Sequence, residues 1–394
     1  MSIKKLFLIS TFFIFTGFYV QDVIAQESSE PRLEEVVVTA QKKEQGLSEV
    51  PISIQVLSSE RITDMGVSSW EEIAQYVPGL TVAKGVQEQS IYMRGVGSGT
   101  NKGFEQSVTQ FVDGMSVTRS QQYTVPLLDL ERIEVLKGTQ GVLFGKNTIA
   151  GVINTVSKSP VIGGDLDAYI SQELVNDWST NKLNMATNIP VSDNFAIRVA
   201  LSSNESDGWV DNAFTNEQEP QTKSEAIRAT FLYELDDMEI NLKVFKSDSE
   251  RIGQHSQVTH WGLSAPPPSI IAAGRTVAVA AFSIANAAFP QLAQNVGKDF
   301  TTTNSMNIYG SQNPNGGTND AENMILNIKT TANDHDLSWT STMSEYDFTE
   351  GADADMSPLD FLSVSGNEQY ESTTHELVIT SPSSDTFEYI AGFF

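Results

Sequence analysis

Few side chains in this 394-residue sequence stand at spacings that support catalysis or metal binding. The four histidines are His255, His260, His335 and His375, and only the first two lie close together, five residues apart in a predicted loop. No Ser/His/Asp spacing for nucleophilic catalysis stands out, nor does a carboxylate pair for acid–base chemistry. The sequence therefore predicts no catalytic residue, no metal site and no cofactor.

A glycine-rich stretch, GVLFGKNT at 141–148, superficially resembles a phosphate-binding loop. It lacks the spacing and the closing Gly-Lys-Ser/Thr of that motif. We therefore expect Gly95, Gly138, Gly145 and Gly151 to serve tight turns or close backbone approaches, which are structural roles.

The stretch EEVVVTAQ at 34–41 could act through its backbone. Its three consecutive valines favour an extended conformation because their side chains are β-branched. No turn and no second apolar run follows closely enough for a hairpin, so we expect a strand without a partner in the chain. Its free N–H and C=O groups could pair with another chain. The alternative is that the stretch forms the first strand of the sheet that follows.

The N-terminus predicts export. A basic MSIKK is followed by the apolar LFLISTFFIFTGFYV, and Val23 and Ala25 suit a cleavage site, so we expect a signal peptide at 1–25. An uncleaved membrane anchor is the alternative, but the apolar run is short for a spanning helix, which needs about 20 residues.

Composition limits the classes of function. The chain has no cysteine, so disulfides cannot stabilise it. Its 24 basic and 50 acidic residues give a net charge of −26, which argues against nucleic-acid binding. Beyond the signal peptide, no run of 18 or more apolar residues predicts a membrane-spanning helix.

Residues 46–160 are typical of a compact α+β domain. PISIQVLS at 51–58 predicts a strand, and Ser59 is expected to cap a short helix after it. SSWEEIAQYVPG at 68–79 predicts a second helix, because its acidic first turn suits the helix dipole. Short strands follow, with a tight turn at Asp113-Gly114.

The pattern changes in residues 161–394. About nine segments of about ten residues alternate in polarity, as membrane-spanning β-strands do. Short polar turns join some segments and long connections join others, which predicts antiparallel transmembrane β-barrel strands; a soluble antiparallel sandwich is the alternative. The short turns are 191–194, 235–238 and 333–336, and the long connections are 203–223, 248–320 and 349–370.

A barrel in lipid must close, and bacterial single-chain barrels have even strand numbers. The sequence predicts an odd number of strands and ends on FEYIAGFF at 387–394, in the middle of the sheet. We therefore expect the N-terminal part of a longer protein. A barrel completed by several such chains is the alternative.

Several segments taken together resemble TonB-dependent outer-membrane receptors. They are EEVVVTA, EVPISIQVLSSERI, IYMRGVG, FVDGM and DLERIEVLKGTQGVLFGKNTIAGVINTVSKSP. The resemblance covers the plug domain of that family almost completely, together with the start of its barrel. It implies an α+β plug domain at 46–160, followed at 161–394 by antiparallel transmembrane β-barrel strands, about nine of an expected 22.

The resemblance also implies roles for individual residues. A periplasmic leader at 26–45 would contain the TonB box, which an energy-transducing partner binds by strand addition. Arg94 and Arg132 match plug arginines that face carboxylates on the inner barrel wall. Gln87 and Gln89 lie in a candidate apical loop that faces the substrate. The residues that match the box are Glu35, Val36, Val37, Val38, Thr39 and Ala40.

These implications predict TonB-dependent active uptake of a scarce ligand, such as an iron–siderophore complex, across the outer membrane of a Gram-negative bacterium. The expected partners are a TonB-type energy transducer with its inner-membrane motor, outer-membrane lipid, and a small-molecule or metal-complex ligand, without nucleic acid. The alternative is a secreted β-rich ligand-binding protein without energised transport. A secreted enzyme would need a catalytic constellation that the sequence does not offer. The ligand is not readable from the sequence.

Overall fold

The computed structural model describes residues 37–39, 42–43, 45–67, 69–84, 89–99, 105–124, 127–175, 179–212, 216–253, 316–353, 363–382, 384 and 387–394. Residues 37–394 form one compact unit. The predicted signal peptide and the pair His255 and His260 lie outside the described residues.

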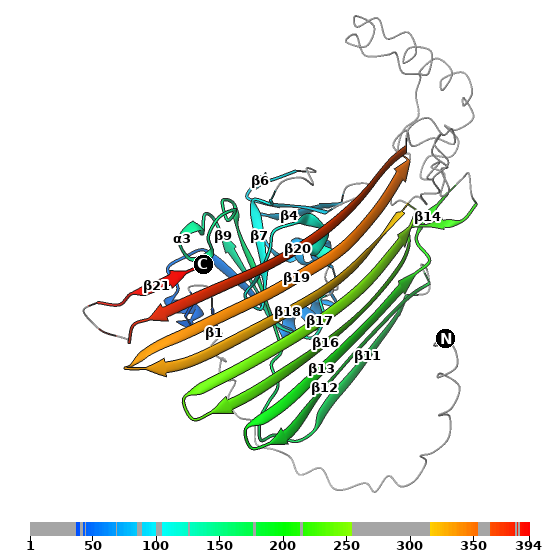
Figure 1. Cartoon of the computed structure of the whole chain (residues 1–394). Coiled ribbons are helices and arrows are strands. Elements are labelled where there is room, and N and C mark those ends of the chain that lie inside the picture. The colour runs from blue at the N-terminus through cyan, green and yellow to red at the C-terminus, as the bar shows by residue number, and fades with distance from the viewer. Residues whose placement is uncertain are drawn as a thin grey trace, which may run out of the picture. The chain divides into compact units, whose positions relative to one another are not determined.

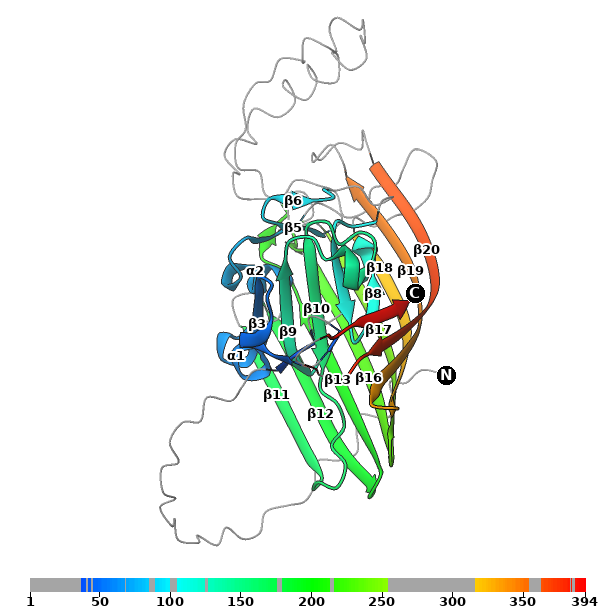
Figure 2. The ribbon, with the colours of Figure 1, turned by 90° about the vertical axis from the view of Figure 1, so that its left-hand side faces the viewer.

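The first part of this unit, residues 37–157, consists of short strands and helices and is called the N-terminal domain below (Figure 2). Its helices are α1 (Ser59–Met65), α2 (Trp70–Tyr76) and α3 (Gly141–Phe144), with 3-10 turns η2 (Leu47–Glu49) and η3 (Ser120–Thr124). Its strands are β1 (Val37–Val38), β2 (Gln45–Gly46), β3 (Ile54–Ser58), β4 (Leu80–Lys84), β5 (Gln89–Met93), β6 (Val96–Gly97), β7 (Val108–Val112), β8 (Met115–Val117), β9 (Leu130–Lys137) and β10 (Gly151–Ser157).

The central sheet of the N-terminal domain is five-stranded, with the order β3-β9-β10-β7-β8. Strands β10 and β7 are parallel, whereas the other neighbouring pairs are antiparallel. The remaining strands form the three-stranded sheet β4-β5-β6 and the two-stranded sheet β1-β2.

Side-chain caps define where the first two helices begin. The Ser69 hydroxyl accepts a hydrogen bond from the backbone N–H of Glu72, whose carboxylate accepts from the N–H of Ser69. Helix α1 is capped by Ser58, whose hydroxyl accepts from the N–H of Arg61. The prediction that Ser59 is the cap was therefore wrong by one residue, because Ser58 still has an extended backbone and Ser59 is already helical.

The core of the N-terminal domain lies between its helices and its sheets. Ile73 of α2, Met93 of β5 and Ile153 of β10 are fully buried in one apolar cluster. Gly151 permits this close packing, because a Cβ there would lie 2.1 Å from the Met93 sulfur. The predicted role of Gly151 in a close approach is confirmed. The predicted turn at Asp113-Gly114 is also confirmed, since both residues have positive φ between β7 and β8.

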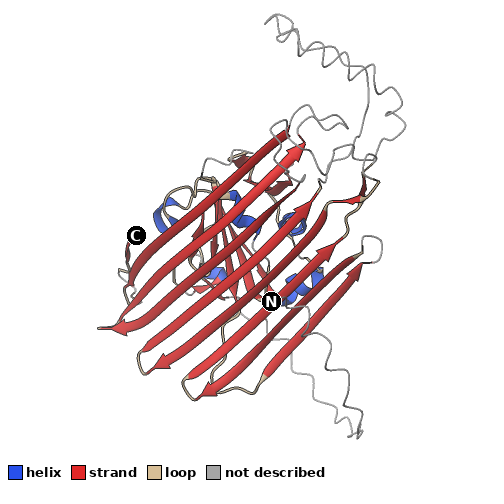
Figure 3. Cartoon of the chain, turned by 45° about the vertical axis from the view of Figure 1, so that its right-hand side comes forward, coloured by secondary structure: helices blue, strands red, loops and turns tan. Residues whose placement is uncertain are grey.

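A large antiparallel sheet follows, called the wall sheet below (Figures 1 and 3). Its nine strands pair in the order of the sequence. The strands are β11 (Asp167–Val175), β12 (Thr180–Ser192), β13 (Phe195–Ser206), β16 (Gln221–Leu235), β17 (Met238–Ile252), β18 (Gly316–Ala332), β19 (His335–Asp353), β20 (Ser363–Thr380) and β21 (Ile390–Phe393). A small hairpin of β14 (Val210–Asp211) and β15 (Gln218–Glu219) lies between β13 and β16 in sequence. In the described part of the chain, no helix has the length and apolarity that crossing a membrane requires.

The three predicted short turns are confirmed, because pairing resumes directly on either side of each turn. Most of the strands are longer than the predicted ten residues: β16 and β17 each have 15 residues and β19 has 19, whereas β11 has nine. The apolar alternation marks only part of each strand, whereas the backbone ladder continues through polar residues beyond it. Strand β21 is shorter than predicted and begins at Ile390.

The two faces of the wall sheet differ in character. On β17, Asn241 and Lys243 are buried, whereas Met238 and Val244 on the opposite face are exposed. The exposed face becomes charged toward the end of β17, at Lys246 and beyond. Alternation thus separates an apolar outer face from a polar face that receives the N-terminal domain.

Candidate functional site

The box predicted at residues 35–40 is partly described. Glu35, Val36 and Ala40 lie outside the described residues. Val37 and Val38 form β1, which pairs antiparallel with Gln45 and Gly46 of β2. The expectation of a strand without a partner in the chain is therefore wrong. Sequence reasoning missed β2 because a Gln-Gly dipeptide has no apolar pattern.

Side-chain contacts also attach this segment to the N-terminal domain. Val38 is fully buried in an apolar cluster with Phe111 and Leu136. The next residue, Thr39, donates from its backbone N–H to the Glu134 carboxylate at 3.0 Å. The hydroxyl of Thr39 lies 3.3 Å from the same oxygen.

Glu134 is a fully buried carboxylate that collects several donors. Besides Thr39, it accepts from Arg132 Nε at 2.8 Å and from Asn154 Nδ2 at 3.0 Å. A buried carboxylate needs such donors, because desolvation of its charge is otherwise costly. The cluster of Thr39, Arg132, Glu134 and Asn154 is called the Glu134 hub below. It links the box directly to the central sheet.

The structure therefore places Arg132 at the box. Its other contacts are the Glu131 carboxylate and the Thr39 hydroxyl. Arg94 is exposed and donates to the Ser53 hydroxyl at 3.2 Å. Among the described residues, both arginines bond only groups of the N-terminal domain, so the predicted contacts of Arg94 and Arg132 with the barrel wall stay predictions.

Only one of the two glutamines predicted in the apical loop lies among the described residues. Gln87 lies outside the described residues. Gln89 is half-buried at the start of β5, opposite Lys84 in the register of the β4–β5 pair. The role of both in substrate binding stays a prediction.

Buried ion pairs connect the N-terminal domain to the wall sheet. The Asp129 carboxylate, which is completely buried, accepts from Arg198 Nε and Nη2, both at 2.7 Å. Arg228 donates to the backbone oxygens of Leu128 and Asp129 at 2.9 Å. The bidentate bond between Arg198 and the Asp129 carboxylate fixes the orientation of the two side chains as well as their distance.

A second buried pair lies at the turn between β7 and β8. Lys243 Nζ is 2.7 Å from Asp113 Oδ1 and also donates to the Ser157 hydroxyl at 2.9 Å. Burial opposes ionisation of Asp113, but the charges of Lys243 and Arg228 and the hydrogen bonds from Lys243 and Ser157 outweigh it. They hold the pKa of the Asp113 carboxyl below its usual range.

Sequence reasoning missed these pairs because the resemblance pointed to basic residues on the plug and acidic residues on the wall. In these two buried pairs the polarity is reversed, since Asp113 and Asp129 lie on the N-terminal domain. A signal was present: Arg198, Arg228 and Lys243 are single basic residues inside otherwise apolar segments of three successive wall strands.

Two lysines next to the box bond carboxylates in the C-terminal part of the chain, one on β20 and one just before β21. Lys42 Nζ bonds both carboxylate oxygens of Glu376 on β20, at 2.9 and 2.8 Å. Lys43 Nζ is 3.2 Å from Glu388. Because β20 pairs here with the start of β19, the box lies at the end of the wall sheet that carries the short turns.

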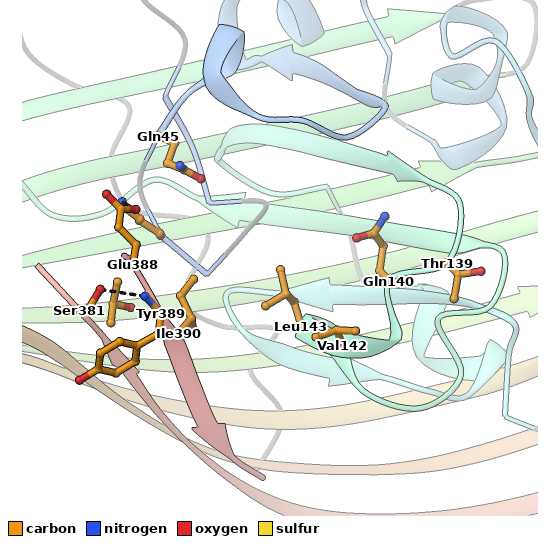
Figure 4. A pocket seen from close by; sticks show the side chains of 11 residues that line it. Gln45, Thr139, Gln140, Val142, Leu143, Ser381, Glu388, Tyr389 and Ile390 are labelled. Carbon is orange, nitrogen blue, oxygen red and sulfur yellow. Dashed lines mark hydrogen bonds and ion pairs between the residues drawn. The ribbon is translucent and has the colours of Figure 1, made fainter. Parts of the chain in front are cut away.

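A cavity of about 470 Å³ is lined in part by Lys43 (Figure 4). Leu143 and Val142 of α3 line one side of it, and Ser381 and Tyr389 line the other. The Tyr389 backbone N–H donates to the Ser381 hydroxyl at 2.9 Å. The mixed lining could receive an apolar group with a polar edge. Among the described residues, no group of three or more His, Asp or Glu side chains is arranged to hold a metal ion.

Comparison with known proteins shows which family this architecture resembles. Residues 46–152 match the family model of the TonB-dependent receptor plug domain. The chain is similar to the vitamin B12 transporter BtuB of Vibrio vulnificus, with 34% identity over 131 residues, which are 32% of this chain and 20% of the relative. It is also similar to the iron-regulated outer membrane virulence protein of Vibrio cholerae, with 33% identity over 132 residues, again 32% of this chain and 20% of the relative. The matched segments thus span about a fifth of the length of these relatives.

The fold is similar to that of the ferric yersiniabactin uptake receptor FyuA from Yersinia pestis. The TM-score is 0.68 at 18% identity, and the match covers 86% of this chain and 47% of that chain. These comparisons confirm the resemblance stated from the sequence and the fold class, an α+β plug followed by the N-terminal portion of an antiparallel barrel sheet. The predicted location in the outer membrane of a Gram-negative bacterium is confirmed as well.

Proposed function

We propose that this chain, which combines the plug domain and the first barrel strands of a TonB-dependent receptor, serves the energised uptake of a scarce ligand across the outer membrane. The box at Glu35–Ala40 would receive a TonB-type transducer, and force applied there would rearrange the plug. An iron–siderophore complex or a similar solute is the proposed ligand class. The boundaries 1–25, 26–45, 46–160 and 161–394 are kept as the proposed signal peptide, leader, plug and barrel segment.

The observation that carries this proposal is the position of the box. In the described part of the chain, β1 belongs to a two-stranded sheet, so one of its edges has no strand beside it. That edge could accept a strand of the transducer. The neighbouring Glu134 hub joins the segment that contains β1 to the central sheet. A force applied to the box would therefore be transmitted to the central sheet of the plug.

The relatives support the ligand class. One curated relative is named as a vitamin B12 transporter, and two solved structures of similar fold are named as the ferric yersiniabactin uptake receptor and a pyoverdine outer membrane receptor. All of these names describe transporters or receptors, in agreement with our proposal that the chain is not an enzyme. A secreted ligand-binding protein without energised transport would have no use for the box.

Deletion of Glu35–Ala40 tests the proposal. Uptake of radiolabelled vitamin B12, iron-loaded yersiniabactin and iron-loaded pyoverdine is measured in cells that express the protein. For each probe whose uptake depends on the protein, we expect the deletion to abolish accumulation while surface binding remains. Val37→Pro should act in the same way because proline removes a backbone donor from the box. If the deletion variant accumulated every such probe as well as the unaltered protein does, the proposal would be contradicted.

A further inference from the structure

A second cavity, of about 870 Å³, lies between the N-terminal domain and the wall sheet, and is called the wall chamber below. Thr39, Lys42 and Gly114 line it on the side of the N-terminal domain. Residues of β16 to β20 and the short turn at 235–238 line it on the other side. The wall chamber therefore lies beside the box, at the end of the wall sheet that carries the short turns.

A row of polar side chains, two of them buried and one half-buried, forms one side of the wall chamber. Asn241, Asn327 and Thr340 are register partners on β17, β18 and β19. The Thr340 hydroxyl donates to Asn327 Oδ1 at 2.8 Å. Asn241 is only 6% exposed, and its side-chain oxygen has no hydrogen-bond partner in the described part of the chain. A buried acceptor of this kind is stabilised when a donor reaches it.

The charges of the wall chamber are unbalanced. Eight carboxylates and five basic side chains line it. The basic groups are already paired: Lys243 with Asp113, Lys42 with Glu376, and the others likewise with carboxylates. Three carboxylates of the lining, Glu234, Asp236 and Asp237, have no basic partner in the described part of the chain. The lining therefore leaves unneutralised negative charge and an unsatisfied acceptor, a combination that suits donors and cations.

The turn at Asp113-Gly114 borders the wall chamber. Lys243 ties this turn to the wall through Asp113. A Cβ placed on Gly114 would lie 3.4 Å from Thr340 Cγ2, so the tip of the turn is in contact with the polar row. Motion of this turn would change access to Asn241 and its neighbours.

We propose that the wall chamber is an exit chamber for the transported ligand, and that it admits neutral or cationic groups rich in hydrogen-bond donors while disfavouring anionic ones. Its place beside the box puts it where a rearranged plug would open toward the periplasm. The exit role rests on the proposed uptake function, whereas the charge preference follows from the lining alone.

The charge preference can be measured without any transport. The chain contains no cysteine, so Asn241→Cys introduces a single thiol. The purified variant is treated with two methanethiosulfonate reagents of similar size, one carrying an ammonium group and one a sulfonate. Each rate is divided by the rate of the same reagent with 2-mercaptoethanol. We expect the cationic reagent to react at least tenfold faster on this scale. A ratio near one, or no reaction with either reagent, would overturn the chamber proposal.

The exit role needs a transport measurement with a matched control. Asn241→Phe should lower uptake of any probe that shows box-dependent accumulation by at least tenfold, with surface binding unchanged. Asn204→Phe is the control, because Asn204 on β13 also has a buried side-chain oxygen without a partner but does not line the wall chamber. Equal uptake by both variants would overturn the exit role. Loss of box dependence together with a preserved reagent ratio would instead remove only the proposed uptake function.

Discussion

At the scale of single residues, the Glu134 carboxylate decides how the box is held. It is fully buried, and the backbone N–H of Thr39 is one of its donors. Two sheet residues, Arg132 and Asn154, bond the same carboxylate. The box segment therefore contributes two donors to this network, the backbone N–H and the hydroxyl of Thr39.

Glu134→Gln should loosen the box. A hydrogen bond to a charged group contributes about 1.5 kcal/mol or more, which corresponds to about tenfold in the opening equilibrium. Trypsin should therefore cleave after Lys42 or Lys43 about tenfold faster in this variant. Glu131→Gln is the control, because its carboxylate is half-exposed and does not contact the box. Equal cleavage of the two variants would show that Glu134 does not hold the segment.

The Asp113 contact should depend on pH in a defined direction. Its pKa is lowered in the folded protein, so the stability it contributes is present above the unfolded value of about 3.9 and is lost as the pH falls below it. The difference in thermal midpoint between the protein and Asp113→Asn should be constant from pH 7 to about pH 5 and should shrink below about pH 4. A difference that disappears near neutral pH would contradict the assignment.

At the scale of elements, the hairpin of β7 and β8 joins the plug to the wall. Its two turn residues both have positive φ, which matches the twist of tight hairpins. Asp113 gives this turn its ion pair to Lys243, and Gly114 lets its tip approach Thr340. Backbone conformation and wall contact are thus specified by adjacent residues.

Gly114→Ala should destabilise the protein by about 1–2 kcal/mol, because a Cβ is strained in the left-handed conformation. Gly141→Ala is a matched control, since Gly141 begins a helix and a Cβ there would meet no atom within 4 Å. Thermal unfolding of the detergent-solubilised protein would separate the two variants. A Gly114 variant as stable as the Gly141 variant would show that the turn tolerates a side chain.

At the scale of the whole molecule, the outer face of the wall sheet shows where lipid would lie. In register across β16 to β19, Ala229, Val244, Met324 and Met343 form an apolar row. Two rows farther along the strands, the corresponding positions hold Glu225, Asp248, Asp320 and Asp347. The change from apolar to acidic rows sets one boundary of the lipid-facing band.

Leu242 lies on the same outer face as Val244, one row further into the apolar band, between Phe231 and Leu326. Leu242→Arg should lower the stability of the protein in lipid vesicles by about 2–4 kcal/mol, as a charge near the middle of the membrane does. Asp248→Arg, on the same face of the same strand, should cost about 1 kcal/mol or less because it lies outside the band. Urea titration followed by the gel mobility of folded and unfolded forms would measure both. A similar loss of stability in the two variants would show that the boundary of the lipid-facing band lies elsewhere.

The sequence by itself determined the succession of an α+β domain and about nine antiparallel strands, the short turns, and the capped helices. These features follow from local signals, such as alternation along a strand or a serine before an acidic first turn. They are readable because each signal lies within a few residues of the element it defines.

Only the tertiary structure decided which groups meet. The pairing of Val37 and Val38 with a Gln-Gly dipeptide, the bonds of Asp129 to Arg198 and Arg228, and the wall chamber all join distant segments. No local pattern encodes them, because their energies depend on burial and on charges contributed by other strands. Contacts between segments also explain why the wall strands extend beyond their apolar alternation. Backbone hydrogen bonding to a neighbouring strand continues where the side chains become polar.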